Sequence, residues 1–372
     1  MKIHLKSPIS DSWRQDALKK IKDIQEKNPG ISITKELLGG ATNTLKYLAT
    51  FDGAKLFIKI GEKVEREKEV YKQIEDNDIF LKNVNLQNES SDLLVLPYYE
   101  GVSLEEKTLQ NPSEIAKHTK LIIEVLQRTF SKYWVRNIKK NGGSDFGVSL
   151  LKKRYLELNN HINAISFESG DEYSFDGFAT RPVVIQKNNK EIKLPSIKQM
   201  TEKILKLLDK LKPYDGYGIL GDFQPPNILI SKEGIKIVDI SNVVDAGDIA
   251  FDIGKFFNYY NRFFSIAVVR DGHKNNNSHK ITIKNGIIYV HQEKDHYSYA
   301  DKKIIETVEE DFCVHVAKEL NDYTISDRVK LYKFVVSLLT IKRHLQFDGL
   351  DEMLIGNLVD AYYEIHRKVL HI

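Results

Sequence analysis

The sequence contains a single cysteine, Cys313, among its 372 residues. One thiol cannot form an internal disulfide, so a disulfide-stapled secreted scaffold is excluded and a reducing compartment is expected. Cys313 stands in the helix-like run Phe312-Cys313-Val314, where a buried structural thiol is more common than a nucleophile. The cysteine is therefore not a candidate for catalysis.

Long apolar segments are also missing. No stretch approaches the ~20 apolar residues that a membrane-spanning helix needs, and residues 1–10 lack the continuous apolar core of a signal peptide. We therefore expect a soluble cytoplasmic protein with no membrane partner.

The chain lacks an excess of charge of either sign. Lys and Arg together number 55 and Asp and Glu 52, so the net charge is +3, and no basic block is interleaved with aromatic residues. A nucleic-acid partner is therefore not expected. The length and the hydrophobic content of 41% instead predict a protein with two lobes, or one domain with insertions.

The most informative stretch is a polar loop followed by a hairpin, from Gly221 to Asp239. Asp222 lies in the loop, Asn227 stands before a short apolar run, and the returning apolar run ends at Asp239. A hairpin of this length brings Asn227 and Asp239 side by side. Two neighbouring oxygen ligands suit a hard cation such as Mg²⁺, which also binds substrate phosphates. Asp222 would then lie close to the metal without binding it, where an acceptor hydroxyl needs a base.

A glycine-rich turn near the N-terminus lies between two predicted strands. It covers residues 37–44 and includes Gly40, Thr42 and Asn43. In a P-loop the turn would join a strand to a helix and end in Gly-Lys-Ser/Thr, and both features are absent. Small residues let backbone amides approach a phosphate closely, although a Gly-Gly pair between strands is more often only a turn.

A lysine and a glutamate follow this turn. Lys59 lies on a predicted strand over 55–60, which the hairpin signal Asp52-Gly53 joins to the strand before it, and residues 62–74 have a helical period. Glu67 falls among the apolar positions of that helix, and a charge on a buried face needs a partner. Lys59 is the nearest candidate, and such a pair holds a lysine against nucleotide phosphates. The alternative is that both side chains are hydrated.

The chain breaks at Pro97–Gly101, which is the expected boundary between two lobes. Residues 1–97 would form an N-terminal nucleotide-binding lobe led by an amphipathic helix over 11–27. Residues 98–372 would form a helical C-terminal lobe with a hairpin insert near 280–291. Helical patterns in this lobe run over 149–160, 197–211, 301–320, 326–346 and 350–369.

These parts, in this order, resemble the aminoglycoside phosphotransferase and choline kinase family, which shares the protein-kinase-like fold. The resemblance spans roughly residues 35 to 265, and its most specific parts are Gly221–Asn227 and Ile237–Asp239. The run Val64–Glu69 also resembles the first-lobe helix of the family. The implied fold class is α+β, with a small antiparallel-sheet N-lobe and a large helical C-lobe.

The resemblance also implies a role for each matched residue. Asp222 would be the catalytic base, Asn227 and Asp239 would hold Mg²⁺, and Asp252 would brace the catalytic loop. The co-substrate would be ATP or GTP. Its contacts would be Lys59 oriented by Glu67, the turn residues Gly40, Thr42 and Asn43 over the phosphates, and Tyr98, Tyr99 and Gly101 at the hinge.

Two positions depart from the pattern of the family. Leu220 stands where the family usually has a histidine before Gly-Asp, so we expect an altered brace of the loop rather than lost activity. Ser241 stands where many members carry an acid or a glycine, so a second metal ion would be held differently.

The hypothesis that follows is a small-molecule kinase acting on a hydroxyl of an aminoglycoside, an amino alcohol or a sugar. Asp245 and Asp248 could meet a cationic acceptor, although such acids are usually solvated. The aromatic run over 256–264 could cage a quaternary ammonium or stack on a sugar, but at helical spacing it is more often core. The alternatives are a non-catalytic nucleotide-binding module, motivated by Leu220 and Ser241, and a kinase with a protein or lipid-linked glycan as acceptor. The sequence leaves the oligomeric state open.

Overall fold

The structure is a computed structural model. It describes residues 1–5, 12–37, 44–61, 64–74, 77–84, 86, 91–110, 116–141, 144–187, 189–240, 242–263, 279–292, 299–344 and 351–369. The predicted phosphate-covering residues Gly40, Thr42 and Asn43 lie outside the described residues, and so does Ser241.

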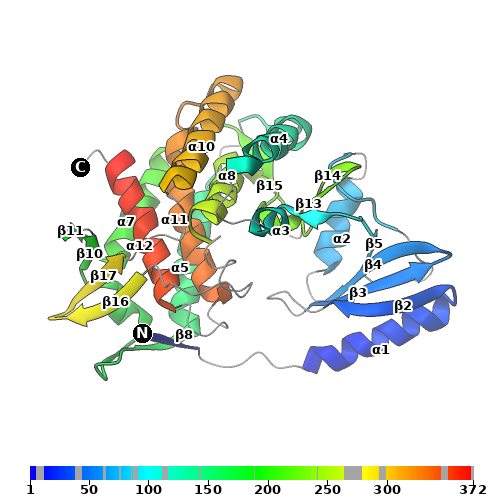
Figure 1. Cartoon of the computed structure of the whole chain (residues 1–372), viewed down its shortest axis with the longest axis horizontal. Helices are drawn as coiled ribbons and strands as arrows, with labels where there is room; N and C mark the ends of the chain where they lie inside the picture. Colours follow the sequence, from blue (N-terminus) through cyan, green and yellow to red (C-terminus); the bar gives the residue numbers. More distant parts are fainter. Residues whose placement is uncertain are drawn as a thin grey trace.

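A four-stranded antiparallel sheet forms the smaller lobe, at the right of Figure 1. Its strands, in spatial order, are β2 (Ile31–Leu37), β3 (Thr44–Phe51), β4 (Ala54–Gly61) and β5 (Leu93–Pro97). The predicted hairpin is confirmed, with Asp52 and Gly53 forming the turn between β3 and β4 at φ values of 49° and 83°. Two consecutive positive φ angles are what a tight hairpin turn requires, and Asp-Gly tolerates them.

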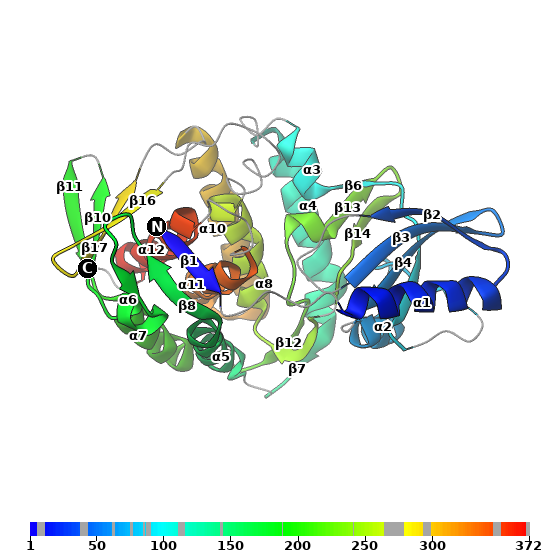
Figure 2. The same ribbon diagram turned by 90° about the horizontal axis from the view of Figure 1, so that it is seen from below.

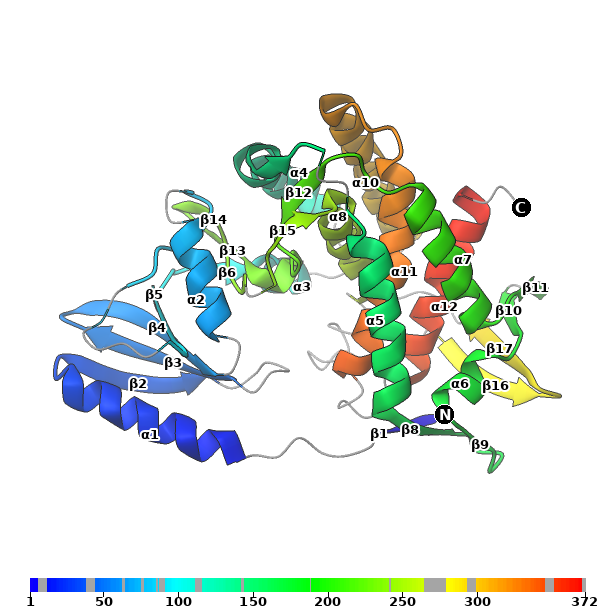
Figure 3. The ribbon, with the colours of Figure 1, turned by 180° about the vertical axis from the view of Figure 1, so that it is seen from behind.

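The two faces of this sheet belong to different cores because side chains alternate along a strand. On β5, Leu93 and Val95 join the core beneath α1 (Ser12–Lys27), while Leu94 and Leu96 join the main core on the other face. Figure 3 shows α1 running along β2, with α2 (Val64–Gln73) across the sheet from it. The predicted N-terminal helix and the helix carrying Glu67 are both confirmed.

A small sheet lies between the lobes. It consists of β14 (Gly234–Ile237), β13 (Ile228–Ser231) and β6 (Val102–Ser103), in that order. The helix α3 (Leu104–Leu109) begins directly after β6 with a capping box between Ser103 and Glu106. The backbone N–H of Ile237 donates to the carbonyl of Ile79 at 2.8 Å, which connects this sheet to the segment that follows α2.

The larger lobe is mainly helical. The helix α11 (Ile325–His344) is surrounded by α5 (Phe146–His161), α7 (Ile197–Lys210), α8 (Ile249–Asn258), α10 (Tyr299–Leu320) and α12 (Asp351–Lys368). Its central residues 331–338 are all buried, as expected for a helix covered on every side. Further helices described in this lobe are the short α6 (Phe175–Ala179) and α4 (Thr119–Thr129), which the π-helical turn η2 (Phe130–Trp134) follows. The helices predicted over 149–160, 197–211, 301–320, 326–346 and 350–369 are confirmed.

Strands at the outer end of this lobe confirm the predicted hairpin insert. The strands β16 (His279–Lys284) and β17 (Ile287–Gln292) turn at Asn285-Gly286, and β17 pairs in parallel with β10 (Val183–Lys187). The strand β11 (Lys190–Leu194) completes a four-stranded sheet with the order β11-β10-β17-β16. Another sheet has the order β15 (Val244–Gly247), β12 (Gly216–Ile219) and β7 (Ile138–Lys139), and β12 leads into the loop that carries Asp222. Figure 2 labels β12 and β7 at the lower middle of the molecule.

The first strand was not foreseen as part of the larger lobe. β1 (Lys2–Leu5) pairs with β8 (Ile162–Ser166), and the backbone N–H of Ile3 donates to the Asp351 carboxylate at 3.1 Å. The first residues therefore lie with the C-terminal lobe, whereas α1 covers the N-terminal sheet. A lobe boundary at residue 97 remains our proposal for the rest of the chain. Among the helices that the structure describes, none is both long and apolar enough to cross a membrane.

Candidate active site

The loop that carries Asp222 connects β12 to β13. Gly221 has a φ of 71°, and a Cβ at this position would lie 2.2 Å from the carbonyl oxygen of Asn242. Glycine is therefore required both by the backbone conformation and by the close approach. The loop ends in the 3₁₀ turn η4 (Pro225–Asn227), which leads directly into β13.

Asp252, on α8, holds this loop through its backbone. Its carboxylate accepts hydrogen bonds from the backbone N–H of Leu220 at 2.7 Å and of Gly221 at 2.8 Å, and from the Trp134 indole at 3.0 Å. Burial raises the pKa of Asp252 to about 6, against the opposing effect of these donors. Asp252 thus stands in the bracing position that the resemblance implied.

The side chain of Leu220 is buried in the core and does not act as a polar brace of the loop. The backbone N–H of Leu220 binds Asp252. The loop is therefore positioned by main-chain contacts that do not depend on the side chain at position 220. An altered brace with retained activity stays a prediction.

Asp222 is buried and makes two kinds of contact. Its backbone carbonyl accepts a hydrogen bond from Asn227 Nδ2 at 3.0 Å, and its carboxylate forms an ion pair with Lys255 of α8. Lys255 also donates to the backbone carbonyl of Gly221 at 3.0 Å. Sequence reasoning missed Lys255, although its position three residues after Asp252 places both side chains on one face of α8.

Asn227 and Asp239 lie at the same end of the hairpin formed by β13 and β14. Ile228 pairs with Ile237 in this hairpin, and the N–H of Val238 donates to the carbonyl of Asn227 at 2.9 Å. The register therefore places the two residues beside each other, as the sequence predicted. Asp239 adopts a φ of 58°, a left-handed conformation that aspartate tolerates better than most residues.

The donor set at this end of the hairpin fits a magnesium ion that is shared with a substrate. Asp239 offers a partly exposed carboxylate, and the amide of Asn227 bonds the loop through its nitrogen, so its oxygen is the atom suited to a cation. Two protein oxygens supply only part of the coordination of a hard cation, so water and phosphate oxygens would complete it.

Lys59 on β4 joins the two lobes at the site. Its Nζ lies 2.5 Å from Glu67 Oε2 on α2 and 3.0 Å from Asp239 Oδ1. Lys59 is 7% exposed and Glu67 1% exposed, so the hydrated alternative does not hold for this pair. A buried glutamate fixes the lysine next to the residue that would hold the metal.

Burial and the neighbouring charges shift the pKa values of Glu67 and Lys59. Burial raises the pKa of Glu67 to about 6, and the opposing effect of Lys59 does not cancel it. Burial also disfavours the charged form of Lys59, but the carboxylates of Asp239 and Glu67 outweigh it and raise the pKa of Lys59. Lys59 therefore stays cationic, while Glu67 titrates in a mildly acidic range.

The titration of Glu67 predicts a pH dependence of nucleotide affinity. Above a pH of about 6 the carboxylate is ionised and holds Lys59, and below it the proton removes that charge. In Glu67→Gln the side chain at position 67 is neutral at every pH, while Lys59 stays cationic. The ratio of wild-type to Glu67→Gln affinity for Mg-ATP should therefore fall from about 10 near pH 7 to about 1 near pH 5, since a charge-assisted hydrogen bond contributes about tenfold.

Isothermal titration calorimetry of both proteins at several pH values measures this ratio. Protonation of the nucleotide itself is common to the two titrations and cancels. A ratio that stays constant over this range would contradict the role of Glu67.

The hinge residues are anchored both to β4 of the N-terminal sheet and to the small sheet between the lobes. The Tyr98 N–H donates to the carbonyl of Lys55 at 2.9 Å, and the Tyr99 hydroxyl donates to the carbonyl of Gly234 at 2.8 Å. A Cβ on Gly101 would lie 2.7 Å from the carbonyl oxygen of Ile230, so this position also requires glycine. Contact of Tyr98, Tyr99 and Gly101 with a nucleotide remains a proposal.

Asp245 and Asp248, the two acids predicted to meet a cationic acceptor, differ in their exposure to solvent. Asp245 is exposed, with its carboxylate 3.6 Å from Lys139 Nζ. Asp248 is buried, caps α8 through the Ala250 N–H at 3.0 Å, and bonds Arg328 Nε at 2.8 Å. An acceptor cannot reach Asp248 because its carboxylate is enclosed by these partners, and contact of an acceptor with Asp245 stays a prediction.

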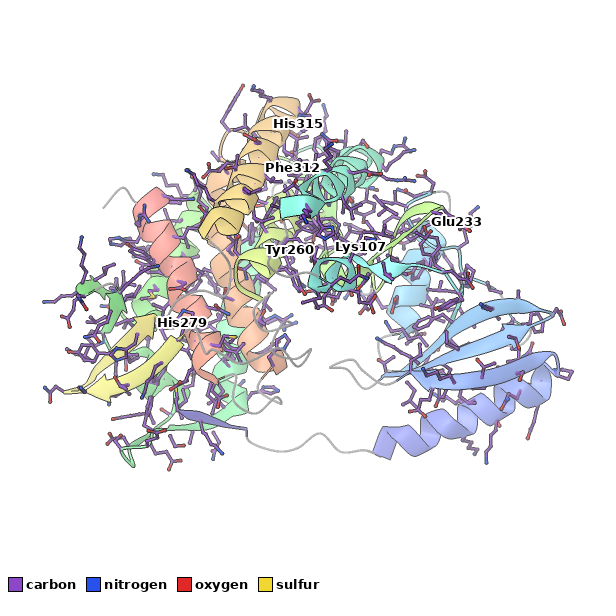
Figure 4. The ribbon with its side chains drawn as sticks, viewed as in Figure 1. Lys107, Glu233, Tyr260, His279, Phe312 and His315 are labelled. Carbon is purple, nitrogen blue, oxygen red and sulfur yellow. The ribbon has the colours of Figure 1, made fainter. Side chains whose placement is uncertain are left out.

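The aromatic run after Asp252 packs as core. Phe256 stacks on Phe223 with ring centroids 5.2 Å apart, and the hydroxyl of Tyr259 donates to Glu105 on α3. The π-helical turn η5 (Tyr259–Phe263) therefore lies against α3, as Figure 4 shows with the labels of Tyr260 on η5 and Lys107 on α3. The buried members of this run, residues 256–260, do not form an open cage for a quaternary ammonium.

The fold is similar to those of small-molecule kinases of known structure. Choline kinase from Cryptosporidium parvum Iowa II has a TM-score of 0.53 at 14% identity, over 95% of this chain and 96% of its own. Aminoglycoside phosphotransferase APH(4)-Ia has a TM-score of 0.56 at 11% identity, with coverages of 93% and 98%. Plasmodium vivax ethanolamine kinase has a TM-score of 0.52 at 14% identity, with 98% of each chain covered.

At these identities the likeness establishes the fold. The predicted α+β, two-lobed, protein-kinase-like architecture is confirmed, and the resemblance to the aminoglycoside phosphotransferase and choline kinase family holds at the level of structure. No family model matches the sequence, and no curated protein is detectably similar to it in sequence.

Proposed function

We propose that this protein is a phosphotransferase that moves the γ-phosphoryl group of ATP or GTP to a hydroxyl of a small molecule. The observation that carries the proposal is the bridge of Lys59 to Glu67 and Asp239, at the end of the hairpin where Asn227 also lies. A buried cation beside two oxygen donors is an arrangement for polyphosphate. The kinase-like fold supports the same assignment.

Each residue of the site would have a separate role in the transfer. Lys59 would bind the nucleotide phosphates, and Asn227 and Asp239 would hold Mg²⁺, which when bound would offset phosphate charge. Asp222 would accept the proton of the acceptor hydroxyl. The hydroxyl oxygen forms a bond to the γ-phosphorus, the bond to the β-phosphate oxygen breaks, and the nucleoside diphosphate leaves. Positioning and electrostatics account for the rate, without covalent chemistry by the protein.

The acceptor class is proposed from the neighbours in fold. Those neighbours are a choline kinase, an ethanolamine kinase and an aminoglycoside phosphotransferase, the last of which has also been solved in complex with ADP and hygromycin B. Amino alcohols, aminoglycosides and sugars are therefore the first compounds to test. A non-catalytic nucleotide-binding module is the alternative, and the intact brace between Asp252 and the loop weakens it.

A mass-shift screen tests this proposal directly. Purified protein is incubated with Mg²⁺, ATP or GTP and a panel of these compounds, and each is examined for the addition of one phosphoryl group. We expect at least one compound to be modified, and nucleotide to raise the melting temperature only with Mg²⁺. Nucleotide binding that ignores Mg²⁺, with no compound modified, would favour the non-catalytic module.

A further inference from the structure

One face of α8 contacts three consecutive residues of the catalytic loop. Asp252 accepts hydrogen bonds from the N–H groups of Leu220 and Gly221, at 2.7 and 2.8 Å. Three residues later on the helix, Lys255 donates to the carbonyl of Gly221 at 3.0 Å and forms an ion pair with the Asp222 carboxylate. The helix therefore holds both the backbone of the loop and its reactive side chain.

The position of Lys255 goes beyond what a loop brace requires. The Lys255 side chain is 12% exposed and that of Asp222 is 4% exposed, so both charges are largely removed from water. Removing an ammonium from water costs free energy, and Asp252 already fixes the loop backbone at Leu220 and Gly221 without Lys255. A cation beside the proposed base thus has an electrostatic consequence for the reaction, in addition to any contribution to the fold.

The charge changes of the reaction indicate what this cation would do. In the transfer proposed above, the proton of the hydroxyl moves to Asp222 while the hydroxyl oxygen binds the γ-phosphorus. Asp222 then becomes neutral, and the ion pair loses its negative partner. The phosphorus of the transferred group is at that moment bonded to the oxygen that gave Asp222 its proton, so the negative oxygens on this phosphorus lie beside Asp222 and become anionic partners of Lys255.

We propose that Lys255 orients the Asp222 carboxylate before transfer and faces the transferred phosphoryl group during it. This proposal rests on the proposed function. It places one cation, Lys255, beside the proposed base Asp222. The other cation, Lys59, lies beside Glu67 and Asp239. The acceptor hydroxyl therefore reacts between two lysines that come from different lobes.

Lys255→Met, which keeps the length of the side chain and removes the charge, tests this role. Since loss of one preorganised donor at a transition state typically costs about 100-fold in kcat, we expect a decrease of that size with an unchanged affinity for Mg-ADP. Lys255→Arg restores the cation and should recover most of the lost rate. The matched control is Lys198→Met, because Lys198 is an exposed lysine in a surface pair with Asp176, and its turnover should equal that of wild type.

Turnover is measured as Mg-ATP hydrolysis with water as acceptor, or as transfer to any acceptor found, and affinity for Mg-ADP is measured by calorimetry. Wild-type turnover in Lys255→Met would overturn the role of Lys255 alone. A loss of turnover matched by an equal loss of Mg-ADP affinity, or no recovery in Lys255→Arg, would show a structural brace and also overturn it. If wild type itself shows neither turnover nor Mg²⁺-dependent nucleotide binding, the proposed function fails, and the Lys255 proposal with it.

Discussion

Replacing Asp222 by asparagine is expected to lower the rate of phosphoryl transfer by about 1000-fold, because general-base catalysis typically contributes 10²- to 10⁴-fold. Asparagine has nearly the same shape, but its amide cannot accept the proton of the acceptor hydroxyl. The substitution also deprives Lys255 of its anionic partner. The loop should keep its position, because Asp252 holds it through the backbone of Leu220 and Gly221.

The measurement is single-turnover transfer, or Mg-ATP hydrolysis if no acceptor has been identified, together with calorimetric affinity for Mg-ADP. Affinity should remain within about threefold of wild type, since Asp222 is not proposed to bind the nucleotide. Asp176→Asn is the matched control, because Asp176 is an exposed carboxylate of the same lobe. Turnover of Asp222→Asn at the wild-type rate would exclude Asp222 as the base.

Replacing Arg328 by methionine is expected to destabilise the protein by about 3–5 kcal/mol, as breaking a buried ion pair on one side does. Arg328 is fully buried on α11 and bonds Asp248 through Nε at 2.8 Å and Nη2 at 3.2 Å. It also bonds Asp322 at 2.7 Å. Without it, Asp248 at the start of α8 would be a buried carboxylate with its main partner removed.

Urea unfolding followed by circular dichroism measures this change as a shift of the midpoint at constant slope. The double variant Arg328→Met/Asp248→Leu should be more stable than Arg328→Met, since it removes the stranded charge as well. Arg154→Met is the matched control, because its pair with Glu157 is a partly exposed i,i+3 contact on α5 that contributes at most about 1 kcal/mol. Equal destabilisation by the two single variants would contradict the importance of the buried pair.

Arg328 is also connected to the candidate site. Asp248 caps α8, and α8 carries Asp252 and Lys255 to the loop that holds Asp222. We therefore expect the ion pair of Arg328 with Asp248 to hold the start of this helix, and through it the loop. We expect Arg328→Met to retain less activity than its remaining folded fraction accounts for.

The local features of the fold could be predicted from the sequence because their causes are local. Asp52-Gly53 and Asn285-Gly286 supply the positive φ angles of two hairpins, and Ser196 with Gln199 forms the capping box of α7. The adjacency of Asn227 and Asp239 follows from the length of their hairpin. Each of these depends on residues that lie close together in the chain.

Other features depended on partners far away in the sequence. The pattern around Glu67 was compatible with a hydrated or a buried side chain, and only the packing of α2 on the sheet determined that it is buried against Lys59. The sequence around Asp248 is compatible with a surface acid, but in the fold its carboxylate is buried against Arg328, which lies far along the chain. The pairing of β1 with β8 likewise had no local signal.

The loop and hairpin that hold Asp222, Asn227 and Asp239 follow from short stretches of the sequence, because local backbone conformation and short spacing specify them. The charges that meet at this site depend instead on how distant segments pack together. Lys59 reaches Asp239 across the lobes, and Lys255 reaches Asp222 from α8. Ion pairs of this kind require two segments to be buried against each other, and burial is a property of the whole fold rather than of any one stretch.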